Sequence, residues 1–169
     1  HYLNVLETTS NMNIFYLDED PKLAAIYQYN KHVVKMILES AQMLCTVHRH
    51  FGNDDVPYKS THKNHPSTVW ARTNNRNYMW LYWHMIALGE EYYVRYGRKH
   101  LTITKCEDVL SKFPPLLKDA LYGDPIDMPQ CMPDEYKDKC SVQAYWNYYI
   151  GEKHTVANLN KEIIYEQRP

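Results

Sequence analysis

Glycine, cysteine and long apolar runs are scarce in this chain of 169 residues, and each scarcity excludes a class of protein. Five glycines do not supply the glycine-rich phosphate loops of P-loop and Rossmann proteins, and neither motif occurs. The four cysteines are widely separated, which excludes paired zinc knuckles and a dense disulfide framework. No apolar run approaches about 18 residues, the length of a membrane span. We therefore expect free thiols, no membrane partner and a cytoplasmic protein.

An excess of charge of one sign is also lacking, because 19 basic residues balance 20 acidic ones. The net charge of −1 excludes a polycationic coat for nucleic acid. The basic residues are nevertheless concentrated, since residues 48–105 carry nine lysines and arginines and six of the nine histidines. A basic, histidine-rich centre in a neutral chain indicates a local site for an anion, such as a substrate that bears phosphate.

Tyrosine is the residue type in surplus. Sixteen tyrosines help to bring the aromatic fraction to 14%. A tyrosine ring stacks on flat groups while its hydroxyl forms hydrogen bonds. The surplus therefore fits a surface that handles bases, sugars or peptides, and it fits the core of a helical protein equally well.

The hydrophobic pattern predicts a mainly α protein, with a single compact helical domain over residues 12–169. Residues 1–11 are interpreted as an upstream extension or tag remnant. A short extended segment is expected from Met12 to Leu17, and Asp20 before Pro21 predicts a helix start. Ser141 is expected to cap the last helix. Helices are predicted over residues 21–29, 30–51, 67–72, 75–96, 104–113 and 142–158. Asn74 and Asn75 are expected to cap the helix 75–96, and Gly97 to end it. Its apolar side collects Tyr78, Leu81, Tyr82, Met85, Leu88 and Tyr92.

A polar stripe on the predicted helix 30–51 is the first candidate site. The apolar face opposite it collects Val33, Val34, Ile37, Leu38, Ala41, Leu44 and Cys45. The stripe itself consists of His32, Lys35, Glu39, Gln42, Thr46 and Arg49. Facing a cleft, Glu39 is expected to act as general base or to stabilise positive charge, and Lys35 to pair with it or serve as an amine nucleophile. His32 is expected to carry protons. A solvated helix face with an ordinary Lys–Glu pair is the alternative.

A polar loop over residues 59–66 is the second candidate, because it precedes the start of a predicted helix and is rich in hydrogen-bonding side chains. The residues expected to hold phosphate are Arg49, Lys59, His62, Lys63, Asn64, His65 and Arg72. Trp70 and Tyr78 are expected to stack against a base. His62 and His65 lack further ligands nearby, so we predict neither a metal nor a cofactor. An ordinary polar loop is the alternative.

The end of the predicted helix 75–96 combines aromatic and cationic side chains, and it is the third candidate. Tyr93 is expected to stack on a base, and Arg95 to grip phosphate. Cations at a helix C-terminus also stabilise the helix dipole, which is the alternative reading of this segment.

From Met12 onward, segments such as KHVVKMILESAQMLCTVHR, THKNHPSTVWAR and AYWNYYIGEK resemble a family of uncharacterised proteins met mostly in phages. The resemblance covers nearly the whole chain from that residue. It implies a phage source and a host-cell cytoplasmic location. It implies little about the reaction.

A second resemblance is to pyrimidine-dimer DNA glycosylases of the endonuclease V type, some of which carry an N-H-P segment like Asn64-His65-Pro66. Those small helical enzymes cut the N-glycosidic bond with an N-terminal amine and a glutamate on the first long helix. Glu39 has the corresponding position here. Asn13 after Met12 does not favour removal of the methionine, so a Schiff-base step would require Lys35 or Lys31.

These observations predict a phage enzyme that acts on a nucleotide or a nucleic-acid base, with DNA as the favoured substrate and cleavage of the N-glycosidic bond as the reaction. Extrusion of the base from a duplex would give access to that bond. The alternatives are a non-catalytic protein that binds a nucleotide or a host protein, and a helical interaction module without a small ligand. The oligomeric state is left open.

Overall fold

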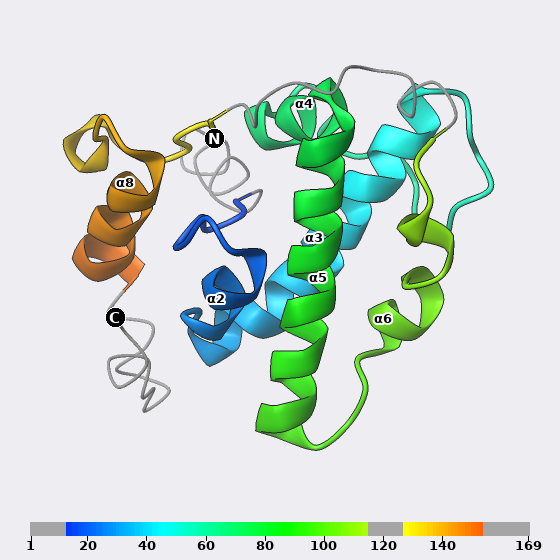
Figure 1. Ribbon diagram of the computed structural model, residues 1–169, viewed down its shortest axis with the longest axis horizontal. Coiled ribbons are helices and arrows are strands. Elements are labelled where there is room, and N and C mark those ends of the chain that lie inside the picture. The colour runs from blue at the N-terminus through cyan, green and yellow to red at the C-terminus, as the bar shows by residue number, and fades with distance from the viewer. Residues whose placement is uncertain (1–12, 115–126, 154–169) are drawn as a thin grey trace, which may run out of the picture.

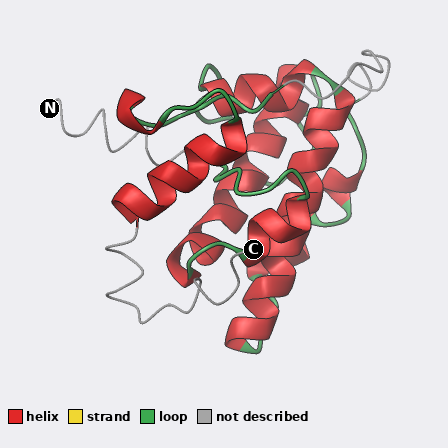
Figure 2. Ribbon diagram, turned by 60° about the vertical axis from the view of Figure 1, so that its left-hand side comes forward, coloured by secondary structure: helices red, strands yellow, loops and turns green. Residues whose placement is uncertain are grey.

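The computed structural model describes residues 13–114 and 127–153, and all regular structure in these ranges is helical (Figures 1 and 2). The mainly α fold is therefore as predicted. The α-helices are α2 (Pro21–Ile26), α3 (Asn30–His50), α4 (Pro66–Thr73), α5 (Asn75–Tyr96), α6 (Leu101–Cys106) and α8 (Ser141–Tyr148). Shorter turns are η1 (Val109–Ser111), η2 (Asp134–Tyr136) and the π-helical η3 (Tyr149–Lys153).

The two long helices α3 and α5 form the centre of the molecule (Figure 1). Helices α2 and α4 pack against α5, α4 also packs against α3, and α6 contacts both long helices. Helix α8 lies to the other side of α2 from α5 in Figure 1 and continues directly into η3. Among the described helices, none has the length and apolar character needed to cross a membrane.

Capping residues explain where α2 begins and where α5 begins and ends. Asp20 Oδ1 accepts a hydrogen bond from the backbone N–H of Lys22 at 2.9 Å, which starts α2 as predicted. Asn74 Oδ1 accepts from the N–H of Asn77 at 2.8 Å, and so caps α5. Gly97 ends α5 with φ of 73°, a left-handed conformation that costs glycine little.

Residues 13–17 form neither a helix nor a strand, but the predicted extended segment bends at Phe15, where φ is 57° and the Leu17 N–H donates to the Phe15 carbonyl at 2.9 Å. Ile14, Phe15 and Leu17 are buried, and no strand pairing is present within the described residues. Asn13 ties this segment to residue 131, because its Nδ2 donates to the carbonyl of Cys131 at 2.9 Å. The segment therefore belongs to the core.

The apolar face predicted for α3 is correct except at two positions. Val33, Ile37 and Leu44 are fully buried, whereas Val34 and Leu38 are 37% and 38% exposed. Neighbouring helices cover only part of α3 along its first two turns. The apolar face of α5 is confirmed, since the predicted residues are all buried: Tyr78, Leu81, Tyr82, Met85, Leu88 and Tyr92.

The helix predicted over residues 104–113 is wrong at both ends. Helix α6 begins at Leu101, because His100 Nδ1 accepts a hydrogen bond from the N–H of Thr102 at 3.1 Å. It ends at Cys106, and η1 follows it. This earlier start buries Ile103 against α5, where its side chain contacts Gly89 so closely that a Cβ there would lie 2.7 Å from it.

The cap predicted for the last helix is also wrong. Cys140 occupies the cap position of α8, and Ser141 Oγ instead donates to the carbonyl of Met128 at 2.8 Å. The helix widens into a π-helical turn at Tyr149. The predicted continuation to residue 158 lies partly outside the described residues.

Many of the tyrosines are core residues. Tyr29, Tyr78, Tyr145 and Tyr149 are almost completely buried. The hydroxyls of Tyr78 and Tyr145 donate to the backbone carbonyls of Leu110 and Pro129, both at 2.6 Å. Because the hydroxyls of Tyr78 and Tyr145 find carbonyls, their rings can fill the core without leaving an unpaired polar group.

Candidate active site on helix α3

Glu39 is the most unusual titratable group on the predicted stripe. Its side chain is buried on α3, with only 8% of the residue exposed. Among the described residues, its Oε2 atom has no hydrogen-bond partner. Burial raises the pKa of Glu39 to about 7, and the charge of Lys35 one turn away opposes that rise. A carboxyl group in this state exchanges protons near neutral pH, as a general base or acid requires.

Three lysines lie near His32, and one of them, Lys35, also acts on Glu39. Lys31 and Lys35 lie one turn apart on the exposed side of α3, and Lys153 comes from the end of η3. Burial lowers the pKa of Lys153, the charge of Glu152 opposes this, and the charges of Lys35 and Lys31 lower it further. The same three lysines depress the pKa of His32. Three ammonium groups therefore share one region, a distribution that attracts anions.

His32 does not fulfil the sequence-based role of proton carrier in this structure. Its ring is stacked on Phe15 with a centroid distance of 4.4 Å, and its Nδ1 lies 2.6 Å from the hydroxyl of Tyr149. Burial lowers the pKa of His32 to about 3, and the nearby lysines add to this effect. The ring is therefore neutral at pH 7, and it joins α3 to η3 as part of the core.

The C-terminal half of the stripe holds a loop. Thr46 Oγ1 accepts a hydrogen bond from the N–H of Thr61 at 3.1 Å. Arg49 donates to the carbonyls of Tyr58 and Val56, at 2.8 and 2.9 Å. Arg49 was predicted to bind phosphate, but its guanidinium is occupied by these carbonyls because the loop crosses α3 there.

The predicted phosphate loop reaches α3, but at some distance from Glu39. Thr46 is seven residues beyond Glu39, about 10 Å along the helix. The side chains of Lys59, His62, Lys63 and Asn64 are exposed on the loop. His65 caps α4, because its Nδ1 accepts from the N–H of Ser67 at 3.1 Å. The loop thus presents cations to solvent, while its histidine starts a helix.

The predicted base-stacking and phosphate residues outside the loop divide into core and surface. Tyr78 is completely buried and Trp70 is 6% exposed, so both rings belong to the core rather than to a stacking surface. Arg72 donates to the backbone carbonyl of Lys63 and so tethers the loop to α4. Tyr93, in contrast, is 60% exposed near the end of α5 and is accessible to a ligand.

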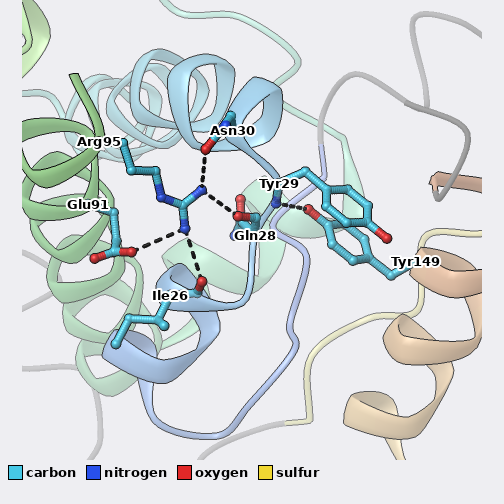
Figure 3. Close-up of polar contacts among 7 residues, drawn as sticks. All are labelled: Ile26, Gln28, Tyr29, Asn30, Glu91, Arg95 and Tyr149. Atoms are coloured by element: carbon cyan, nitrogen blue, oxygen red, sulfur yellow. Dashed lines mark hydrogen bonds and ion pairs between the residues drawn. The ribbon is translucent and has the colours of Figure 1, made fainter. Parts of the chain in front are cut away.

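Arg95 was also predicted to bind phosphate, but its guanidinium forms hydrogen bonds and an ion pair within the protein (Figure 3). Its guanidinium donates to the carbonyls of Gln28 and Ile26, at 2.7 and 3.0 Å. It also contacts Asn30 Oδ1 at 3.0 Å and forms an ion pair with Glu91 at 3.1 Å. Arg95 therefore joins α5 to the segment between α2 and α3.

Besides Glu39 Oε2, four buried side-chain oxygens that sequence reasoning missed lack a hydrogen-bond partner among the described residues: Gln28 Oε1, Thr68 Oγ1, Asn75 Oδ1 and Asn77 Oδ1. Thr68 is completely buried, and its Oγ1 has no hydrogen-bond partner within the described ranges. Helices α3 and α4 pack against each other, so Glu39 and Thr68 belong to two packed elements that each contain an unsatisfied oxygen. Thr68 offered no sequence signal, because a threonine in a short helix is ordinarily unremarkable.

Two open pockets were also not predicted. One of about 680 Å³ lies between the end of α3 and η1, and its lining includes His48, Phe51, Asp108 and Phe113. The other, of about 490 Å³, lies at the start of α3 beside the end of α5. Glu39 lines neither pocket. The second is lined by residues from helix ends that are more than sixty positions apart, which no local pattern reveals.

Within residues 13–114 and 127–153, no group of three or more histidine, cysteine, aspartate or glutamate residues is arranged to hold a metal ion. All four cysteines are free thiols, with Cys45 and Cys106 buried.

The chain was also compared with known proteins. No family model, no curated protein and no solved structure matches it.

Proposed function

We propose that this protein is an enzyme that cleaves the N-glycosidic bond of a nucleotide or a nucleic-acid base, and that Glu39 is its general base. The observation that carries this proposal is the buried carboxyl of Glu39, whose Oε2 has no partner in the described part of the chain. An unsatisfied buried carboxyl is costly, and such groups are retained where a reaction needs them.

The proposed reaction uses the proton exchange that burial gives to Glu39. The carboxylate takes a proton from water, and the water oxygen forms a bond to the anomeric carbon of the sugar. The bond from that carbon to the base nitrogen breaks, and the base leaves with the electron pair and takes a proton from solvent. The ionised carboxylate also stabilises the positive charge that develops on the sugar ring.

The lysines have an electrostatic role in this scheme. Lys31, Lys35 and Lys153 attract the phosphate groups of the substrate and hold them beside α3. His32 stays neutral at the pH of the reaction and keeps the start of α3 attached to Tyr149. In keeping with the resemblance, we propose a phage origin and DNA as the favoured substrate.

The test is base release from nucleotides and from oligonucleotides with damaged bases, measured for the wild type, Glu39→Gln and Glu90→Gln. We expect Glu39→Gln to lower the rate by at least about 100-fold, because amide nitrogen cannot accept the proton. Glu90 is exposed on α5 and serves as the matched control. Wild-type activity is expected to fall as the pH drops below about 7, where Glu39 takes up a proton.

Base release by Glu39→Gln at the wild-type rate would remove Glu39 from the mechanism. A protein that binds its ligand stoichiometrically without turnover would favour the alternative of a non-catalytic binding protein. Exposed apolar side chains give that alternative a basis for a host-protein partner, since Trp83, Val94 and Leu101 are 54%, 76% and 64% exposed.

A further inference from the structure

The pocket of about 490 Å³ at the start of α3 has an unusual lining. Its described walls are Asn30, Lys31, Val34 and Lys35 from α3, and Tyr96 from the last turn of α5. Tyr96 is 44% exposed and Val34 is 37% exposed, so an aromatic ring and an aliphatic side chain face solvent beside two lysines. No carboxylate is among these lining residues.

The hydrogen bond from Arg95 holds Asn30, one of the lining residues of this pocket, in place (Figure 3). Because Asn30 Oδ1 accepts the hydrogen bond from Arg95, the amide nitrogen of Asn30 is left as the donor end of that side chain. Glu91 is paired with Arg95, and both side chains are more than four-fifths buried. The acidic group nearest in sequence to Tyr96 is therefore already neutralised within the fold.

The lining therefore offers hydrogen-bond donors and positive charge together with a flat ring. The Lys31 and Lys35 ammonium groups are donors without acceptor capacity, as is the Asn30 amide nitrogen. Lys153 adds a third cation to the same region, because it interacts electrostatically with both lysines of the pocket. This combination fits an anion that is joined to a planar group, and it disfavours a cationic ligand.

We propose that this pocket binds a phosphate ester that carries a planar ring, the chemistry of one nucleoside monophosphate unit, either free or within a single strand. Lys31 and Lys35 contact the phosphate oxygens, Tyr96 stacks on the ring, and Val34 contacts its edge. The proposal rests on the proposed function for its substrate class, and it assigns the recognition of that substrate to specific residues.

Lys35 connects this pocket to the proposed catalytic group. It lines the pocket, and its charge also acts on Glu39 one helical turn further along α3. A phosphate held by Lys35 would lie about one turn of α3 from Glu39. Recognition and chemistry would then occupy successive turns of one rigid helix, which favours accurate positioning.

The experiment is calorimetric titration of the whole chain with adenosine monophosphate, adenosine, inorganic phosphate and a four-nucleotide thymidine strand. It compares the wild type with Lys31→Gln, Lys35→Gln, Tyr96→Leu and the control Lys105→Gln. We expect the two pocket lysine variants to weaken binding of the monophosphate by about tenfold each, and Tyr96→Leu by several-fold. Lys105, an exposed lysine of α6, is expected to have less than about a twofold effect.

Adenosine and inorganic phosphate are each expected to bind at least about tenfold more weakly than adenosine monophosphate, because each lacks half of the recognised chemistry. Tighter binding of the strand assigns the site to single-stranded nucleic acid, and tighter binding of the monophosphate assigns it to a free nucleotide. Unchanged affinity in both pocket lysine variants, or a loss only in Lys105→Gln, would overturn the proposal. Absence of binding by all four probes would also overturn it.

The Glu39→Gln variant separates this inference from the proposed function. It is expected to retain full affinity for adenosine monophosphate, because Glu39 does not line the pocket. Intact binding without base release from any substrate by the wild type would overturn only the proposed function. Base release that is unaffected by Lys31→Gln and Lys35→Gln would overturn only the pocket.

Discussion

Glu39 shows how a single side chain can combine a cost to stability with a role in chemistry. Its carboxyl is buried, Oε2 has no partner among the described residues, and its pKa is raised to about 7. The fold therefore disfavours the ionised form that a general base must adopt. Groups that are expensive for stability and useful for a reaction are characteristic of active sites.

This cost predicts that Glu39→Gln stabilises the protein in a pH-dependent way. In the unfolded chain Glu39 loses its proton near its ordinary pKa of 4.5, whereas in the folded chain it keeps it up to about 7. The contribution of Glu39 to stability therefore falls as the pH rises through this interval. We expect the advantage of Glu39→Gln to be absent below about pH 4.5 and to reach up to about 3 kcal/mol above about pH 7.

Urea unfolding of the wild type and Glu39→Gln at several pH values measures this difference. Taking the difference between the two proteins removes the contributions of all other groups that titrate in both. An advantage of Glu39→Gln that is the same at every pH would show that the carboxyl is not held in its protonated form.

At the scale of secondary-structure elements, α3 organises both halves of the candidate site. Its first turns contribute lysines and Glu39, while its last turns bind the loop that crosses them. Arg49 holds that loop through the carbonyls of Tyr58 and Val56, and Thr46 adds a contact to Thr61. The exposed loop cations are thus fixed relative to α3 by backbone contacts rather than by their own side chains.

We predict that Arg49→Ala releases this loop. The variant leaves two carbonyls without their charged donor, so we expect a loss of about 1–3 kcal/mol in the free energy of unfolding. Hydrogen exchange of the amides over residues 54–61 should become faster, while the middle of α3 stays protected.

Asp54→Ala is the matched control: Asp54 pairs with Arg49 at 3.5 Å, but its side chain is 80% exposed. The control should cost less than about 0.5 kcal/mol. Equal effects of the two variants would contradict this role of Arg49.

At the scale of the whole molecule, histidines act as neutral connectors between elements. His84 Nδ1 donates to the carbonyl of Pro21 at 2.9 Å, which joins α5 to α2. His48 Nδ1 accepts from Asn53 at 2.9 Å, and its Nε2 lies 2.7 Å from the Tyr78 hydroxyl. Together with His32, these rings form contacts that need an unprotonated nitrogen or an uncharged ring.

The neutral histidines predict that the protein loses stability in mild acid. Burial lowers the pKa of His48 and His84 to about 4, and that of His32 to about 3. The unfolded chain takes up these protons near pH 6.5, so stability is fully present above that pH and falls as the pH drops toward 4. The loss approaches a few kcal/mol for each histidine.

Urea midpoints between about pH 7.5 and 4.5 measure this loss. The variant His48→Gln should show a weaker pH dependence than the wild type. The control is His50→Gln, at an exposed position in the last turn of α3, and it should follow the wild type. Glu39 titrates with the opposite sign in this interval, so the decisive protein is Glu39→Gln. A midpoint of that variant that does not change between these pH values would contradict neutral burial of the three histidines.

The sequence by itself determined the elements that local chemistry specifies. Asp20 with Pro21, and Asn74 with Gly97, marked the ends of α2 and α5 because capping depends on a few neighbouring residues. The period of apolar residues determined the mainly α class and the buried face of α5. It also directed attention to Glu39, because a carboxylate in a polar stripe stands out in a sequence.

Only the tertiary structure decided what those side chains face. Arg49 and Arg95 were predicted to bind phosphate and His32 to carry protons, yet each is used by backbone carbonyls or a hydroxyl of another segment of the fold. Asn30 and Tyr96 meet at one pocket although sixty-five residues separate them. Periodicity assigns a residue to a face of its own helix, but the partner across that face depends on how the helices pack, and packing is a property of the whole chain.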